Sequence, residues 1–153
     1  MRNKHLKKSL IPNNASQRNK TKYIDQDAAF HLDLNKTGND LKVFISIKHL
    51  QHDFQCFSEW SKKEMKEFWN FNTKLHELTW KDVYASARKS NKSGVGYTVI
   101  PIKNYPDSSF KENLSQDITI LELRVNKKIR VHGFRNSSVF FLCWLDKNHK
   151  ITS

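Results

Sequence analysis

Alternation of hydrophobic and polar residues is the first pattern in the chain, and it indicates β-strands. Over residues 41–48, aliphatic side chains occupy every second position. Three stretches near the end of the sequence are separated only by short polar turns, which predicts an antiparallel meander. The last stretch is apolar almost throughout, so it is expected to lie centrally in the sheet. The stretches with extended patterning are 41–48, 97–102, 118–125, 128–135 and 139–146.

A helical period separates the first strand from the meander. Residues 61–77 place their apolar side chains on one helical face, and Ser61 with Glu64 three residues later has the spacing of a capping box. Thr79 and Asp82 repeat that spacing and predict a second, short helix. The two helices are expected to form a hairpin. The aromatic residues Phe68, Trp69 and Phe71 on the first helix are interpreted as core side chains rather than as a platform for stacking bases.

The order of these elements predicts an α+β domain. A helix hairpin would pack on a mainly antiparallel sheet that ends in a three-stranded meander. Residues 23–153 are expected to form this single domain. Residues 1–22 have no hydrophobic period and contain seven Lys or Arg residues without one acidic residue, so they are interpreted as a flexible basic arm.

The positive charge of the chain indicates what kind of molecule it binds. The formal net charge is +12, and residues 122–150 alone hold seven basic residues against Glu122 and Asp146. Clusters of this kind attract nucleic-acid backbones, because binding releases condensed counterions, and RNA is the expected partner. The chain has no apolar run long enough for a membrane span, and its basic N-terminus is not followed by a secretory apolar stretch. A cytoplasmic protein without a membrane partner is therefore expected.

The meander brings candidate catalytic residues together. Arg130 and His132 lie two residues apart on one strand and share a face, and Arg124 belongs to the preceding strand. Arg135 closes the second strand. His132 alternates out of phase with its apolar neighbours and is expected to face solvent. An imidazole can transfer the proton of a ribose 2′-OH, and arginines can hold the phosphate, so this patch predicts RNA cleavage without a metal.

Further lysines and arginines are candidates for steering or binding the nucleic acid. Two of them stand in the turn of the meander hairpin, three lie in a polar loop after the helices, and two follow the last strand. In chain order these residues are Arg88, Lys89, Lys92, Lys127, Lys128, Lys147 and Lys150.

Other chemistries have little support in the sequence. The seven histidines and two cysteines show no HExxH motif, no CxxC motif and no paired spacing of zinc ligands, so neither a metal nor another cofactor is expected. Cys56 and Cys143 both stand among apolar residues and are interpreted as buried thiols.

Three segments carry a resemblance to a known family. They are LELRV at 121–125, RVHGFR at 130–135 and VFFLCWLD at 139–146. Together they resemble the C-terminal half of the RelE/ParE superfamily of type II toxins, in which an ELR strand leads into an R-V hairpin and an apolar strand. Arg124, Arg130, His132 and Arg135 match positions where that family has functional basic residues.

The resemblance implies a RelE- or HigB-like mRNA interferase, an endoribonuclease that cuts mRNA, often on the ribosome, and is neutralised by a small acidic antitoxin. Family members are usually shorter than this chain and carry a terminal catalytic tyrosine that is absent here. The alternative that the protein is a cleavage-dead or gyrase-directed relative of these toxins therefore stays open. The alternative from another class is a non-catalytic module of a mobile element that binds nucleic acid or inhibits a protein.

Overall fold

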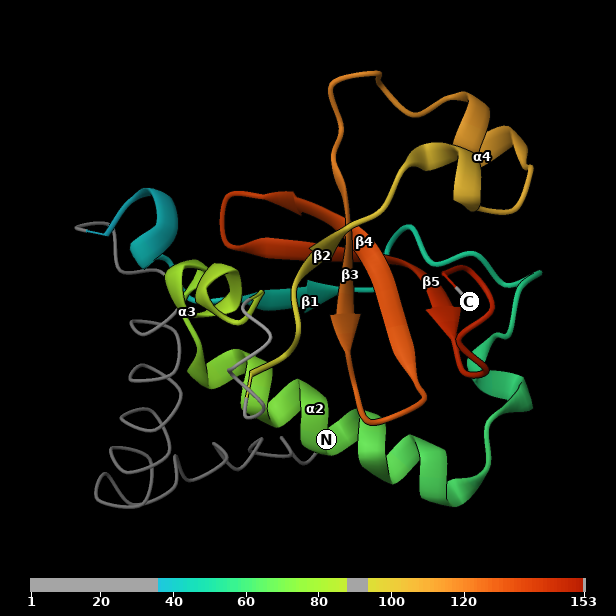
Figure 1. The fold of residues 1–153 in the computed structure, drawn as a ribbon, viewed down its shortest axis with the longest axis horizontal. Coiled ribbons are helices and arrows are strands. Elements are labelled where there is room, and N and C mark those ends of the chain that lie inside the picture. Colours follow the sequence, from blue (N-terminus) through green and yellow to red (C-terminus); the bar gives the residue numbers. More distant parts are fainter. Residues whose placement is uncertain (1–35, 88–93, 153) are drawn as a thin grey trace, which may run out of the picture. The chain divides into compact units, whose positions relative to one another are not determined.

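The computed structural model describes residues 36–87 and 94–152, which belong to one compact unit. In this unit a five-stranded mixed sheet is combined with three α-helices and short 3-10 turns (Figure 1). The predicted α+β class and the C-terminal meander are therefore confirmed. The proposed basic arm, residues 1–22, lies outside the described residues, as do the candidates Arg88, Lys89 and Lys92.

The strands lie in the spatial order β1-β5-β4-β3-β2. β1 runs parallel to β5 and every other pair is antiparallel, so the sheet is mainly antiparallel, as predicted. The apolar β5 does lie inside the sheet, between β1 and β4, although β4 is the central strand. The bounds are Phe44–Ser46 for β1, Thr98–Val99 for β2, Ile120–Arg124 for β3, Arg130–Asn136 for β4 and Val139–Asp146 for β5.

The two predicted helices are α2 (Lys62–Glu77) and α3 (Trp80–Ala85). Each begins with a complete capping box, Ser61 with Glu64 and Thr79 with Asp82, in which side chain and backbone exchange hydrogen bonds. Such a cap is worth about 1 kcal/mol to a helix. A third helix, α4, covers Ser109–Glu112 and was not predicted, and the 3-10 turns η1, η2 and η3 cover Gly38–Asp40, Phe57–Glu59 and Ile102–Asn104. None of the described helices is long and apolar enough to cross a membrane.

The sheet has a hydrophobic core on each face. Phe71 and Leu75 of α2 and Trp80 of α3 pack on one face against residues such as Leu123 and Leu142. On the other face a second core combines residues of the sheet with residues from the β2–β3 connection and from the segment after β5, namely Ile100, Tyr105, Ile120, Cys143, Trp144 and Ile151. Both faces of β3, β4 and β5 are therefore largely covered. Side chains on these strands that were predicted to face solvent can be buried instead.

Trp69 and Cys56 are less buried than the sequence predicts. Trp69 is 66% exposed, because the helical face that packs on the sheet carries Phe71 and Leu75 instead. Cys143 is buried as predicted, but Cys56 is only half-buried and lies in the loop before η2. The predicted strand 41–48 is also shorter, since Lys42 bridges to Thr79 and Ile47 is 60% exposed beyond the sheet.

Candidate functional site

His132 does not face solvent, contrary to the sequence prediction. Its side chain is fully buried, although it does point away from the buried Val131 as alternation requires. The reason is the second core. The ring of Tyr105 lies against the imidazole with centroids 5.3 Å apart, and the same ring stacks on Trp144 at 4.5 Å. The face that was expected to be open is therefore closed by residues from the β2–β3 connection.

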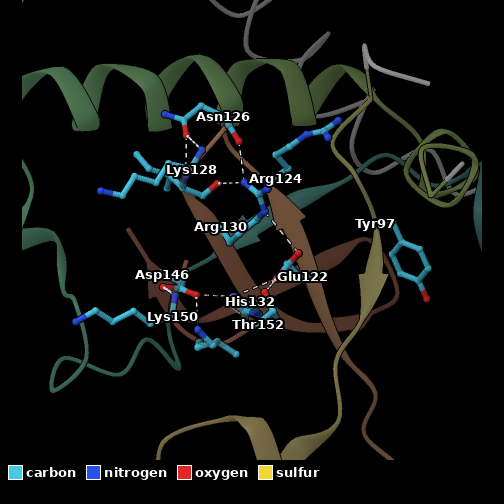
Figure 2. Close-up of polar contacts among 12 residues, drawn as sticks. Tyr97, Glu122, Arg124, Asn126, Lys128, Arg130, His132, Asp146, Lys150 and Thr152 are labelled. Carbon is cyan, nitrogen blue, oxygen red and sulfur yellow. Dashed lines mark hydrogen bonds and ion pairs between the residues drawn. The ribbon is translucent and has the colours of Figure 1, made fainter. Parts of the chain in front are cut away.

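The buried imidazole sits among polar groups. Its Nδ1 is 3.0 Å from the hydroxyl oxygen of Tyr105. Its Nε2 lies 3.8 Å from Oε2 of Glu122 and 3.7 Å from Oδ2 of Asp146, and it has no hydrogen-bond partner in the described structure. Figure 2 shows His132 of β4 between Glu122 of β3 and Asp146 of β5. His132 thus lies between two buried carboxylates and cannot reach an RNA backbone on the surface.

Both carboxylates also bind the residues that follow β5. Asp146 accepts the backbone N–H groups of Lys150 and Ile151, and Glu122 accepts the hydroxyl of Thr152 at 2.8 Å. Burial by itself raises the pKa of Asp146, but the neighbouring His132 and these N–H donors lower that pKa to about 2. The carboxylates and His132 therefore form a structural polar cluster that fastens the segment after β5.

Arg124 and Arg130 lie side by side at the turn end of the β3–β4 hairpin. They are directly paired across the two strands. The Nε of Arg130 is 3.6 Å from Oε1 of Glu122, and its Nη1 donates to the carbonyl oxygens of Asn126 and Ile129. Arg124 donates from Nη2 to the carbonyl oxygen of Gly94 at 3.3 Å.

The two arginines line a cavity of about 640 Å³ between the hairpin and α2, here called the α2 hollow. The helix contributes Glu67, Asn70 and Lys74, and the hairpin contributes Lys127 beside Arg124 and Arg130. Burial lowers the pKa of Arg130, with Glu122 opposing that effect. Because a guanidinium titrates so far above neutral pH, Arg130 stays charged at pH 7 despite this burial.

Four basic side chains and one carboxylate therefore meet in the α2 hollow. The carboxylate, Glu67, accepts a hydrogen bond from the side-chain amide of Asn126. In this concave, partly dehydrated setting, an excess of positive charge favours an anionic ligand. Sequence reasoning missed the α2 contribution. The spacing of Glu67, Asn70 and Lys74 puts them on one side of the helix, next to the buried Phe71, and that periodicity was the available signal.

The remaining predicted residues do not all join this hollow. Lys128 is exposed in the same hairpin turn. Lys147 donates to the carbonyl oxygen of Glu59 and lies 3.9 Å from Glu64, so it fastens the end of β5 to the start of α2. Lys150 is exposed beyond β5, where its backbone N–H binds Asp146.

Arg135 lies on the opposite face of β4 from Arg130 and His132. Its guanidinium stacks 4.6 Å from the ring centre of Trp80 and donates to Tyr84, Asn39 and two backbone carbonyls. Alternation along the strand accounts for this position, since 135 differs in parity from 130 and 132. Arg135 therefore joins η1 and α3 to the sheet and is not gathered with the other predicted catalytic residues.

The described residues contain no group of three or more His, Cys, Asp or Glu side chains arranged to hold a metal ion. Comparison with known proteins adds no further identification: no family model, no curated protein and no solved structure matches this chain.

Proposed function

We propose that this protein binds single-stranded RNA and holds a backbone phosphate in the α2 hollow. The observation that carries the proposal is the direct pairing of Arg124 with Arg130 in a cavity that also takes in Lys74 and Lys127. Guanidinium groups match phosphate oxygens bidentately, and paired arginines can therefore fix both the position and the orientation of a phosphodiester.

The concave shape of the site favours a single strand over a duplex. A duplex is read by helices or ribbons that protrude into its grooves, whereas a single backbone can enter a hollow. The preference for RNA over DNA rests on the resemblance to the RelE/ParE toxins. The resemblance also supports two further parts of the proposal. They are ribosome-bound mRNA as the natural substrate and a small acidic antitoxin as a protein partner.

Cleavage of the bound RNA is the second candidate function, and one observation favours it. Glu67 places a carboxylate in the same hollow as Arg124 and Arg130. A carboxylate can accept the proton of a ribose 2′-OH as that oxygen attacks the phosphorus, while the arginines stabilise the charge that grows on the phosphate. The P–O5′ bond then breaks, which leaves a 2′,3′-cyclic phosphate and a 5′-oxygen that takes a proton from water. In this form of the endoribonuclease hypothesis Glu67 takes the role that was first assigned to His132, because His132 is buried in the structural polar cluster.

A binding experiment with matched variants tests the primary proposal. The affinity of the full chain for a labelled single-stranded RNA would be measured at 50 and 200 mM salt for the wild type, Arg124→Ala, Arg130→Ala and Lys81→Ala. Lys81 is exposed on α3 and does not line the hollow, so it controls for the loss of one positive charge. With three or four phosphate contacts, the wild-type affinity is expected to fall roughly 20- to 50-fold over this range.

Arg124→Ala and Arg130→Ala are expected to weaken binding at least tenfold and to flatten the salt dependence, with Lys81→Ala close to the wild type. Equal losses in all three variants would mean that binding follows net charge alone and would overturn the assignment of the hollow. The same samples, analysed for RNA fragments with and without ribosomes, decide whether the bound RNA is cut. Co-expression with a neighbouring acidic open reading frame tests the antitoxin.

A further inference from the structure

A second hollow lies at the other end of the β3–β4 hairpin, away from its turn. Its volume is about 430 Å³, and its aromatic lining comes from Tyr84 of α3, Tyr97 before β2 and Phe134 of β4. We call it the tyrosine hollow. Asp117 and Thr119, both exposed, stand at its rim, while Leu121 of β3 is buried in its wall.

The charge of the tyrosine hollow is unlike that of the α2 hollow. Its only basic lining residue is Arg135, whose guanidinium already donates to Asn39, Gly38, Tyr84 and Ser137. Its carboxylate belongs to Asp117, and a hydrogen bond from the Ser115 hydroxyl lowers the pKa of that side chain, which is therefore ionised at neutral pH. A phosphate in this hollow would lie near the negative charge of Asp117, while the one basic lining residue, Arg135, is already hydrogen-bonded within the protein. The hollow therefore disfavours anions.

The aromatic rings suit a flat, neutral ligand. Tyr84 and Tyr97 meet edge to face, with centroids 4.9 Å apart and planes at 84°. Burial, helped by Tyr84, raises the pKa of Tyr97, so its phenol stays protonated and can donate a hydrogen bond. Stacking faces, a phenol donor and a carboxylate acceptor are the groups that recognise an unpaired nucleobase, whose edge carries both donors and acceptors.

The two hollows have no lining residue in common, but their linings approach each other along the segment before β2 and along β3. Gly94 and Val95 line the α2 hollow, and Tyr97, two residues later, lines the tyrosine hollow. On the sheet side, Arg124 and Leu121 of β3 line the two hollows respectively. Three residues of a strand span about 10 Å, so the cavities are close enough for one nucleic-acid strand to occupy both.

We infer that the tyrosine hollow binds a nucleobase of the same RNA strand whose phosphate lies in the α2 hollow. The inference rests on the proposed function, and it makes the ligand a single strand with at least one base turned out of the stack. In this arrangement the arginines of the α2 hollow supply charge-dependent affinity, while Tyr97 and Asp117 contact the base.

Two labelled oligomers of equal length and charge distinguish binding of the base in the tyrosine hollow from binding of the phosphate in the α2 hollow. One is single-stranded RNA, and the other is an abasic ribose-phosphate strand. The full chain is expected to bind RNA roughly tenfold or more tightly than the abasic strand, as base stacking on an aromatic side chain allows. Tyr97→Ala should remove most of that difference, and Tyr97→Phe, which keeps the ring but loses the donor, should retain a larger part of it. Thr119→Trp, made at the exposed rim, should block the hollow without disturbing the core.

Arg124→Ala should weaken both oligomers by the same factor. If Tyr97→Ala and Thr119→Trp both leave the preference for RNA over the abasic strand intact, or if the wild type has no such preference, the base-binding hollow is refuted. If Arg124→Ala binds both oligomers as tightly as the wild type does, while the preference for RNA over the abasic strand is retained, the phosphate site is refuted instead. Melting curves identify a Tyr97→Ala protein that fails to fold, in which case Thr119→Trp alone decides the question.

Discussion

The hydroxyl oxygen of Tyr105 lies 3.0 Å from Nδ1 of His132, and the imidazole has no exposed surface. Tyr105 is nearly as deeply buried, and burial together with the negative charge of Glu122 raises the pKa of its phenol. A neutral phenol and an imidazole paired in this way belong to the interior of the domain. The most conspicuous candidate for a catalytic residue in the sequence is therefore a part of the core.

Replacing His132 should damage stability rather than chemistry. His132→Ala removes the group between the carboxylates of Glu122 and Asp146 and leaves a cavity beside Tyr105. The free energy of unfolding is expected to fall by about 2–4 kcal/mol, as for other losses from buried polar networks. Melting temperature and RNA affinity of the folded fraction measure the two effects. His52→Ala, on an exposed side chain, is the control, and a fully stable His132→Ala protein would contradict the prediction.

Asp146 should make the protein sensitive to acid. Its pKa is lowered to about 2 in the folded state, below the ordinary value of 3.8. The ionised carboxylate therefore contributes stability above the ordinary pKa, and this contribution is lost as the pH falls from about 5 towards 2. By linkage it amounts to about 2 kcal/mol at neutral pH.

Denaturant melts between pH 2 and 7 measure this contribution. Asp146→Asn should lower the stability at pH 7 and should flatten its dependence on pH below 5. Asp107→Asn is a suitable control, because the side chain of Asp107 is 98% exposed and pairs with Lys111 at the surface. A wild type and an Asp146→Asn protein with parallel pH profiles would show that other carboxylates govern the acid transition.

Glu67 allows binding and cleavage to be separated. If Glu67 accepts the proton of the 2′-OH, Glu67→Gln should lower the rate of RNA cleavage roughly 100-fold or more. RNA affinity should stay the same or rise, because the substitution removes a negative charge from the α2 hollow. Glu77→Gln, at the exposed end of α2, is the matched control. Wild-type cleavage by Glu67→Gln would eliminate Glu67 as the proton acceptor.

The two cysteines should differ in reactivity. The hydrogen bond between His52 Nδ1 and Cys56 Sγ, 3.3 Å long, lowers the pKa of the Cys56 thiol, whereas burial raises that of Cys143 to about 12. Since the thiolate is the reactive form, iodoacetamide at pH 7.5 should modify Cys56 in the native protein and leave Cys143 intact. Mass spectrometry identifies the modified residue. His52→Ala should slow the reaction, and an unchanged rate would show that the imidazole does not activate the thiol.

Local signals in the sequence predicted local structure well. The capping boxes at Ser61 and Thr79 each depend on two residues three positions apart, and both helices begin where these boxes stand. The meander was also predictable, because its strands pair with their sequence neighbours. The length of β1 could not be predicted in this way, because β1 pairs with the distant β5 and its edge position depends on the whole sheet.

The candidate site was predicted only in part. Arg124, Arg130 and Lys127 do lie together, because register and turn geometry in a hairpin follow from the adjacent sequence. The burial of His132 depends on Tyr105, which comes from a connection without a hydrophobic period, so strand alternation could not reveal it. The position of Arg135 could have been read from its parity in β4.

The parallel pairing of β1 with β5 also bears on how the chain folds during synthesis. Phe44 pairs with Val139, so β1 has to wait for a partner about 95 residues later in the chain. At about 5–20 residues per second, a ribosome needs roughly 5 to 20 seconds to make that interval. Contacts of such long range are formed late and slow the folding rate. Until β5 emerges, the apolar side of β1 has no strand beside it, and the nascent chain is open to aggregation or to chaperone binding.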